Sequence, residues 1–340
     1  MEGLSEVEEA RPWRELDAKV FEERASDEAR RLASKYGYRP YMVERYLELL
    51  GGEAEELLEA NEEPMPQTFR CNDFRVSCSE LVARLGEMGF EIEKLPYLPH
   101  GYVSLSSPIS LGATHEYLKG FYYLQGPGSM IVAYLLDPKP GELIVDMAAA
   151  PGGKTSQILQ LTRDSATVVA VEPKRSRVRA LRSTLQRLGF SNFVIVKGDA
   201  RYASFGGVPD RVLLDAPSSG EGIIRKDPSR KTKTSVEDLR QLHYLQLSLL
   251  KRALSAVRPG GTVVYSACST AVEEGEYVVH KALSGRDDVD TVPIDAYPAR
   301  GAFEEFRGIT FDDRVRRCGR VFPHVHGTEG FFLCVLRRQG

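Results

Sequence analysis

The sequence predicts an α/β protein in which a mostly parallel, doubly wound sheet follows a smaller helical and α/β domain. From about Gly112 onward, short apolar segments rich in β-branched residues alternate with helical segments, the pattern of parallel strands joined by helices. The preceding residues lack this alternation and open with helical segments. At 340 residues the chain is long enough for two domains. We therefore expect an accessory domain over residues 1–110 and the doubly wound domain over residues 111–340.

The accessory domain is predicted to contain three helices and then a small α/β unit. The helices carry apolar side chains at helical spacing, and the first two end at a glycine. Pro64 and Pro66 break this pattern, and Ser77 or Ser79 caps the next helix. In chain order we expect helices at 25–37, 39–51 and 52–63, a strand at 67–74, a helix at 77–89, and extended segments at 90–99 and 101–107.

The doubly wound domain is predicted from six apolar segments with helical segments between them. The longest helix opens with the capping box Ser235-x-x-Asp238. Strands joined by such helices run parallel, so their carboxyl ends meet at one edge of the sheet. We expect strands at 141–148, 167–173, 192–200, 210–217, 261–269 and 330–338, and helices from 154 and at 174–189, 235–257 and 273–283.

The composition, 42% hydrophobic and 27% charged, is that of a globular protein. No apolar run could span a bilayer, and the acidic first twenty residues contain no apolar signal core, so we expect no membrane partner and a cytoplasmic location. The net charge of −3 hides an asymmetry. Residues 1–64 carry 18 acidic and 9 basic side chains, a net of −9, which leaves +6 for residues 65–340. The longer part is therefore the better candidate for contact with phosphates.

The cysteines do not predict a disulfide framework, because their number is odd and no two have CxxC spacing. A zinc site made of Cys71, Cys78, His324 and His326 is conceivable, but the spacing does not support it. We expect no metal, and we interpret the cysteines as unrelated core or surface residues. The five are Cys71, Cys78, Cys268, Cys318 and Cys334.

Acidic residues mark the ends of four successive predicted strands: Asp146, Glu172, Asp199 and Asp215. The first continues into Met-Ala-Ala-Ala-Pro-Gly-Gly-Lys-Thr, whose glycines let a ligand approach the backbone at a helix N-terminus. In nucleotide-binding sheets, an acid after the second strand accepts hydrogen bonds from ribose hydroxyls. The spacing is neither GxGxxG nor that of a P-loop. The structural alternative is a glycine-rich turn with acids that cap helices.

Four segments, in order, resemble the signature blocks of the RNA cytosine-C5 methyltransferases of the Sun/NOP group: MAAAPGGKT, DAPSSGEGIIRKDP, VYSACSTAVEEGE and RVFPHVHGTEGFF. ISLGATHEYLKGFYYLQGPGSM is similar to that family's opening segment. The resemblance, to an archaeal-like member, covers about Arg70 to the C-terminus. It implies a Rossmann-like methyltransferase domain and an accessory domain that resembles an RNA-recognition fold.

The resemblance also implies an S-adenosylmethionine site and a catalytic cysteine. Glu172 would hold the ribose, Arg177 lies in a cofactor-contacting segment, and Asp199 would lie near the adenine. Asp215 would lie between the methyl donor and the target base, and Cys268 would be the nucleophile. The cofactor loop would consist of Ala148, Ala149, Ala150, Pro151, Gly152, Gly153 and Lys154.

A cysteine suits this chemistry because carbon 5 of cytosine is a weak nucleophile. A thiolate that adds to carbon 6 makes carbon 5 enamine-like, and carbon 5 then attacks the sulfonium methyl. A base removes the carbon 5 proton afterwards, and the sulfur leaves. The target base must be unstacked to reach the site. Without its family block, Cys268 would be interpreted as an inert core cysteine.

Ser218 departs from the family pattern. The fourth block usually reads Asp-Ala-Pro-Cys-Ser-Gly, and its cysteine helps to release the product. Ser218 stands at that place and is a far weaker base, so two classes of function stay open. One is an RNA cytosine methyltransferase, and the other is an RNA-binding protein with a cofactor pocket and impaired turnover. A DNA cytosine methyltransferase is a poorer third, because those enzymes carry their nucleophile in the Pro-Cys block.

Basic residues predict a surface for RNA, either tRNA or rRNA. One group shares a helix face, where a solvated face is an equal alternative. A second follows the fourth strand, beside the predicted site, where phosphate contact is favoured. A third precedes the last block. In this order the groups are Arg175, Arg179 and Arg182; Arg225, Lys226, Arg230, Lys231 and Lys233; and Arg314, Arg316, Arg317 and Arg320.

Overall fold

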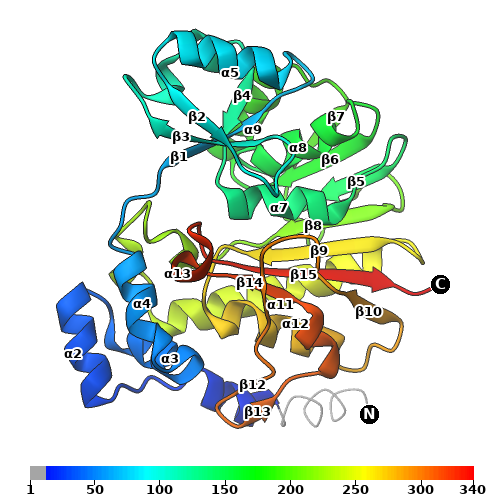
Figure 1. Cartoon of the computed structure of the whole chain (residues 1–340). Coiled ribbons are helices and arrows are strands. Elements are labelled where there is room, and N and C mark those ends of the chain that lie inside the picture. The colour runs from blue at the N-terminus through cyan, green and yellow to red at the C-terminus, as the bar shows by residue number, and fades with distance from the viewer. Residues whose placement is uncertain (1–12) are drawn as a thin grey trace.

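The computed structural model describes residues 13–340, which form N-terminal helices, a four-stranded antiparallel sheet and a nine-stranded main sheet (Figure 1). Residues 13–20 are helical. The Ser26 hydroxyl caps the next helix by accepting a hydrogen bond from the Ala29 N–H, and Gly37 ends it at φ 75°. The further N-terminal helices are α2 (Asp27–Tyr36), α3 (Pro40–Leu50) and α4 (Glu53–Ala60).

The four-stranded sheet follows in the order β2-β3-β1-β4 and packs one face on α5. Ser77 caps α5; it is one of the two serines predicted to do so. The core between this sheet and α5 contains Phe69, Leu81, Leu85 and Tyr122. The elements are β1 (Gln67–Cys71), α5 (Cys78–Glu87), β2 (Glu91–Lys94), β3 (Gly101–Ser106) and β4 (Tyr122–Leu124).

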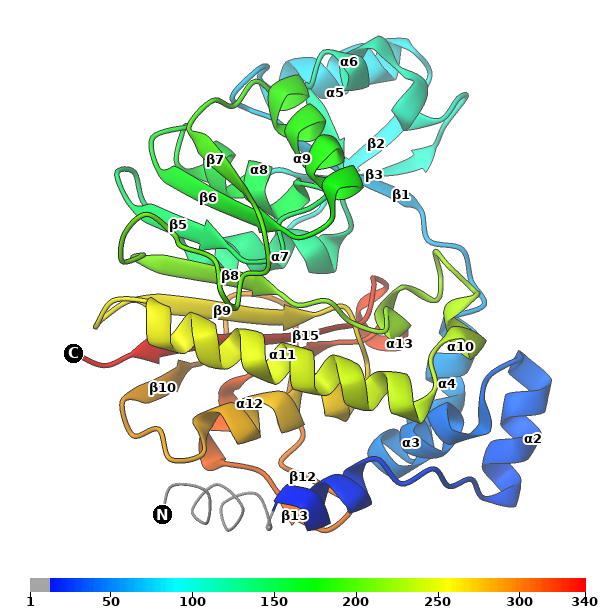
Figure 2. The same cartoon turned by 180° about the vertical axis from the view of Figure 1, so that it is seen from behind.

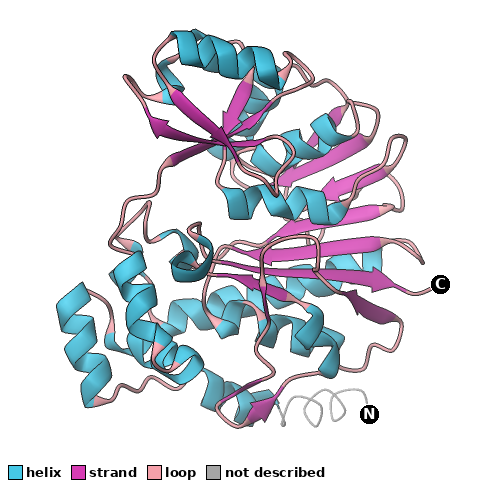
Figure 3. Cartoon of the chain, viewed as in Figure 1, coloured by secondary structure: helices cyan, strands magenta, loops and turns pink. Residues whose placement is uncertain are grey.

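The main sheet has the order β11-β14-β15-β9-β8-β5-β6-β7, with β10 paired to β15. The five strands from β9 to β7 are parallel, and β15 is antiparallel to β9. This confirms the α/β fold with a mostly parallel, doubly wound sheet. The strands, magenta in Figure 3, are β5 (Leu143–Asp146), β6 (Thr167–Glu172), β7 (Phe193–Lys197), β8 (Arg211–Asp215), β9 (Thr262–Ala267), β10 (Val289–Val292), β11 (Arg300–Gly301), β14 (Gly319–Val321) and β15 (Phe331–Arg338).

Helices cover both faces of the main sheet (Figures 1 and 2). Alternate residues of one strand enter opposite cores: Ile144 packs in the core with α7, α8 and α9, and Val145 in the core with α11 and α12. The capping box predicted for α11 is present. These helices are α7 (Pro127–Leu136), α8 (Gly153–Leu161), α9 (Arg175–Leu188), α11 (Val236–Ala256) and α12 (Glu276–Leu283).

Short elements complete the described chain. They are η1 (Leu111–Ala113), α6 (His115–Leu118), η2 (Glu221–Ile223), α10 (Arg230–Lys233), η3 (Val272–Glu274), β12 (Glu305–Phe306), β13 (Ile309–Thr310), η4 (Asp313–Arg317) and α13 (Pro323–His326). Across residues 13–340, no helix has the length and apolar character needed to cross a membrane.

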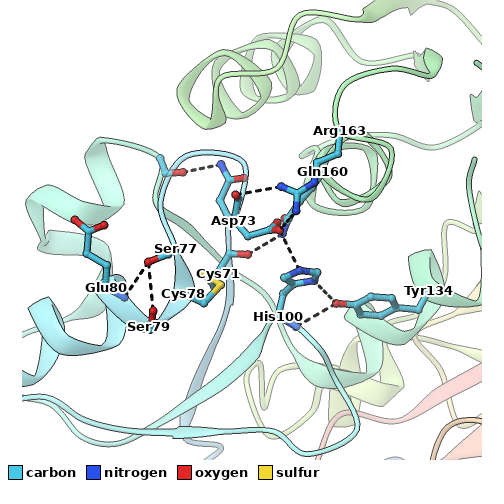
Figure 4. The surroundings of a disulfide bond; sticks show 12 residues. Cys71, Asp73, Ser77, Cys78, Ser79, Glu80, His100, Tyr134, Gln160 and Arg163 are labelled. Carbon is cyan, nitrogen blue, oxygen red and sulfur yellow. Dashed lines mark hydrogen bonds and ion pairs between the residues drawn. A yellow bond between two sulfur atoms is a disulfide. The ribbon is translucent and has the colours of Figure 1, made fainter. Parts of the chain in front are cut away.

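Four of the five cysteines form disulfides, so the expectation of unrelated cysteines was wrong. Cys71 ends β1 and Cys78 begins α5, and the turn between them brings their Cα atoms to 5.8 Å (Figure 4). Cys318 directly precedes β14, and the pairing of β14 with β15 brings it to Cys334 of β15, with Cα atoms 4.5 Å apart. Strand pairing and a tight turn created these contacts, which spacing alone does not reveal. Within the described residues, no three His, Cys, Asp or Glu side chains gather as a metal site.

The N-terminal helices are fastened to the main domain by buried charges. Arg45 of α3 is 1% exposed and pairs with Glu221 and Glu273, which lie in η2 and η3 of the main domain. Asp17 accepts hydrogen bonds from Lys281 at 2.9 Å and from Tyr277 at 2.7 Å. Figure 1 shows these helices and the four-stranded sheet on the side of the main sheet where its parallel strands end.

Candidate active site

The predicted cofactor loop connects β5 to α8, at the point where the strand order reverses between β5 and β8. Gly152 precedes α8 at φ 105°, and no side chain caps that helix. A Cβ on Gly153 would lie 2.8 Å from a Tyr123 ring carbon, so glycine is needed there. Asp146 accepts a 2.6 Å hydrogen bond from the Thr155 hydroxyl, and burial raises the pKa of Asp146 to about 6.

Glu172 ends β6, Asp199 follows β7, and both acids are held by basic neighbours. Glu172 is 1% exposed and accepts a hydrogen bond from the Lys174 N–H at 2.9 Å. Arg177 lies 3.4 Å from Glu172 and donates a hydrogen bond to the Ala150 carbonyl oxygen, which ties the loop to α9. Asp199 pairs with Arg201 at 2.6 Å, and this contact lowers the pKa of Asp199.

A cavity of about 270 Å³ opens at the carboxyl ends of β5, β8 and β9. It brings together most of the predicted site: Ala148, Ala149, Ala150, Pro151, Gly153, Lys154, Asp215 and Cys268. The other predicted residues do not line it: Gly152, Glu172, Arg177, Asp199 and Ser218.

Lys154, Asp215 and Cys268 are three of the polar residues that line the cavity. The Lys154 ammonium donates hydrogen bonds to Asp215 at 2.7 Å and to Ser129 at 2.9 Å. The Ser266 hydroxyl donates to the other Asp215 oxygen at 2.8 Å. Burial raises the pKa of the Cys268 thiol, the carboxylates of Glu329 and Asp215 raise it further, and Lys154 opposes them. The resting sulfur is therefore a thiol.

Ser218 is half-buried and lies outside the cavity lining. Two hydrogen bonds hold the loop around Ser218 in place: Ser219 donates its N–H and its hydroxyl to the Glu274 carboxylate. Gly222 further along the loop donates its N–H to the Cys268 carbonyl oxygen at 3.2 Å. The Cys268 backbone and the loop of Ser218 are thus held in one network, although Ser218 does not reach the cavity.

Sequence reasoning missed several residues of the cavity wall. Glu329 precedes β15 and is 3% exposed. Its sequence signal was its place in the block RVFPHVHGTEGFF, and Gly126 leaves room for it, because a Cβ on Gly126 would lie 1.3 Å from a Glu329 oxygen. The other missed residues are Tyr123, Leu124, Gln125, Gly126, Ser129, Ile223 and Phe331, whereas Asp146 was predicted as a strand-end acid.

The basic residues predicted to meet RNA divide into exposed and internally paired side chains. Arg320 is 1% exposed and pairs with Glu276, so its placement on an RNA surface was wrong: its guanidinium supports α12. In the loop after β8, Lys226 pairs with Glu329 and Lys231 with Glu62. Hydrogen bonds or ion pairs within the protein are also formed by Arg225, Arg230, Arg314 and Arg317. Exposed side chains are Arg175, Arg179, Arg182, Lys233 and Arg316.

Comparison with known proteins identifies the family. Residues 133–337 match the family described as 16S rRNA methyltransferase RsmB/F, and residues 40–127 match the N-terminal domain of 16S rRNA methyltransferase RsmF. A methyltransferase homolog protein of Pyrococcus horikoshii has a solved structure that superposes with a TM-score of 0.83 at 35% identity, covering 92% of this chain and 99% of that one.

Two relatives extend the comparison. The 25S rRNA (cytosine-C(5))-methyltransferase nop2 of Schizosaccharomyces pombe is 37% identical over 316 residues, which are 90% of this chain and 52% of that protein. This chain thus spans about half of that relative's length. A probable ribosomal RNA small subunit methyltransferase B of Bacillus subtilis is 32% identical over 318 residues, with 92% of this chain and 69% of that protein covered. The predicted resemblance is confirmed, and the chain belongs to the RsmB/F family of 16S rRNA methyltransferases.

Proposed function

We propose that this protein transfers a methyl group from S-adenosylmethionine to carbon 5 of a cytosine in RNA. The observation that carries the proposal is the shared cavity. Cys268, Asp215 and the loop before α8 face one space at the carboxyl ends of the strands, where a ligand of a doubly wound sheet lies. Ribosomal RNA is the first substrate to test, because the family and the two relatives are named for it. Transfer RNA is the second.

The residues present suit S-adenosylmethionine, the cofactor of this family. The first turn of α8 has no side-chain cap, so its backbone N–H groups are available to a carboxylate. The loop of residues 148–154 would hold the methionine part, Glu172 the ribose hydroxyls, and Asp199 would lie towards the adenine. Arg177 would hold the loop through Ala150. The bound cofactor supplies an electrophilic methyl group.

The side chains of the cavity would act on the cytosine. The Cys268 thiol gives its proton to solvent, the sulfur adds to carbon 6, and Lys154 offsets the negative charge that burial disfavours there. Asp215, held between Lys154 and Ser266, would accept a hydrogen bond from the base edge. Carbon 5 then takes the methyl group.

We also propose that the division predicted from the sequence has a functional meaning. Residues 1–110 would help to grip RNA, and residues 111–340 would carry the reaction. The separate core around Phe69 and Tyr122 supports an accessory unit, with β4 crossing back into it from beyond residue 110.

The experiment is methyl transfer from labelled S-adenosylmethionine to unmodified ribosomal RNA and, separately, transfer RNA, followed by nucleoside analysis. We expect 5-methylcytidine in one of the two. Cys268→Ala should lower its formation by at least about 100-fold, because the covalent step is lost. Glu172→Ala should weaken donor binding in calorimetry while Cys268→Ala leaves it intact. Donor binding without 5-methylcytidine in either RNA would refute the activity.

A further inference from the structure

We propose that Glu329 is the base that releases the product, by removing the carbon 5 proton from the methylated Cys268 adduct. This proposal rests on the proposed function. It gives the chain a release group in place of the cysteine that Ser218 replaces. Glu329 lies in the wall of the cavity that Asp215 and Cys268 also line, whereas Ser218 does not line it.

The pairing of β15 with β9 brings Glu329 to the thiol. Phe332 lies opposite Ala267, so the residues just before β15 pass beside Cys268. Of the charges that act on the Cys268 thiol, that of Glu329 has the largest effect on its pKa. The Gly330 N–H donates to the Gly222 carbonyl oxygen at 2.8 Å, which fixes the backbone next to Glu329.

The surroundings of Glu329 are built for a carboxylate. Lys226 donates to one of its oxygens at 2.5 Å, and the Thr328 hydroxyl donates to the other at 2.7 Å. Burial acts to raise the pKa of Glu329, but Lys226 and Thr328 hold it below its usual value. Gly126 leaves room for the Glu329 carboxylate, because a Cβ at position 126 would overlap the Glu329 oxygens. An ionised, buried carboxylate beside the reacting atoms can accept a proton.

The alternative groups are less suited. Asp215 accepts hydrogen bonds from Ser266 and from Lys154, and because Lys154 is only 11% exposed, a phosphate outside the cavity cannot draw this cation away. The partner of Glu329, Lys226, is 40% exposed, so its ammonium is accessible to an RNA phosphate. A phosphate that draws Lys226 away would raise the pKa of Glu329 and make it a stronger base once RNA is bound.

The release step balances in atoms and electrons. The carbon 5 proton moves to a Glu329 oxygen, and the electron pair of that C–H bond closes the double bond between carbons 5 and 6. The bond between carbon 6 and the Cys268 sulfur breaks, and the sulfur leaves with the pair as a thiolate. Glu329 then returns the proton to the sulfur, which restores the resting thiol and carboxylate.

The test is a single-turnover reaction with unmodified ribosomal RNA transcribed in vitro, enzyme in excess and methyl-labelled S-adenosylmethionine. Denaturing electrophoresis separates protein-linked label from free methylated RNA. Glu329→Gln should form the adduct at the wild-type rate but release it at least about 100-fold more slowly. The exposed Glu80→Gln serves as the matched control and should release at the wild-type rate.

Calorimetry of S-adenosylmethionine binding establishes that the Glu329→Gln variant is folded. Release at the wild-type rate by that variant would overturn the proposal. Loss of adduct formation would overturn it as well, because Glu329 would then activate the thiol. A wild-type protein that binds the donor and makes no 5-methylcytidine in any RNA would instead refute the proposed function.

Discussion

His243 of α11 shows how one buried ring ties stability to pH. It is fully buried, stacks on Tyr277 with ring centroids 5.0 Å apart, and places Nδ1 2.8 Å from the Glu273 carbonyl oxygen. Burial, and then the charge of Lys281, lowers the pKa of His243 to about 4. The neutral ring therefore donates its Nδ1–H to Glu273 in the folded protein.

The pKa of His243 predicts a loss of stability in acid. Between pH 6.5 and 4 the unfolded chain binds a proton that the folded protein excludes, so the free energy of unfolding falls as pH falls through this window. A shift of this size corresponds to roughly 3 kcal/mol. Urea unfolding at pH 7 and pH 4.5 should show a smaller loss for His243→Asn than for the wild type. Equal losses would contradict the assignment.

At the scale of the element, β1 supports the cofactor loop through a buried cation. Arg70 is 1% exposed, and donates to the Gly153 carbonyl oxygen at 3.0 Å and to the Ser156 hydroxyl at 2.8 Å. No carboxylate in the described chain pairs with Arg70, and burial lowers its pKa to about 10. A buried charge without an ionic partner costs stability, so its position at the first turn of α8 indicates a role in the site.

Arg70→Met should therefore separate stability from donor binding. We expect an unfolding midpoint equal to or above that of the wild type, because the buried charge is removed. S-adenosylmethionine should bind about tenfold more weakly, since the positive potential near α8 is lost, which corresponds to about 1.4 kcal/mol. Calorimetry and urea unfolding measure the two effects. Arg84→Met on the exposed face of α5 is the control. A less stable variant with unchanged affinity would assign Arg70 a purely structural role.

The elements show where sequence reasoning succeeds. The parallel strands were predicted together with their terminal acids, because β-branched segments that alternate with capped helices leave a clear pattern. Helix α7 was missed because it is buried on nearly every side and has no polar face to reveal a period. Strand β4 has three residues, too few to show alternation.

The residues of the cavity also fall into those that the sequence predicted and those that it did not. Asp215 ends β8 and Cys268 directly follows β9, so strand prediction already placed them at one edge of the sheet. Glu329 precedes a strand that runs antiparallel to its neighbour, which puts its beginning at the edge where the others end. That reversal depends on long-range pairing and left no local pattern.

At the scale of the whole molecule, Arg45 joins the N-terminal helices to the loops that carry the site. Its two partners, Glu221 and Glu273, are buried with it. Burial raises the pKa of Glu221 to about 7, and Arg45 acts against that rise. The charge state of Glu221 therefore depends on Arg45.

Arg45→Met should leave two buried carboxylates without a cation and lower the free energy of unfolding by about 3–5 kcal/mol. Glu221→Gln in the same chain should recover part of that loss, since one buried charge is removed. Urea unfolding measures both. Lys35→Met, which removes an exposed pair with Glu55, is the control and should change the midpoint little. A midpoint of Arg45→Met equal to that of the control would show that the buried cluster adds no stability.

The fastening of the N-terminal helices has a consequence for biosynthesis. The partners of Asp17 on α12 are more than 250 positions further along the chain, as the bond to Lys281 shows. At the usual pace of translation, the first helices leave the ribosome on the order of ten seconds or more before these partners exist. During that interval the apolar faces of α2 and α3 have no main sheet to cover them. The net negative charge of residues 1–64 disfavours contact between such early segments of neighbouring nascent chains.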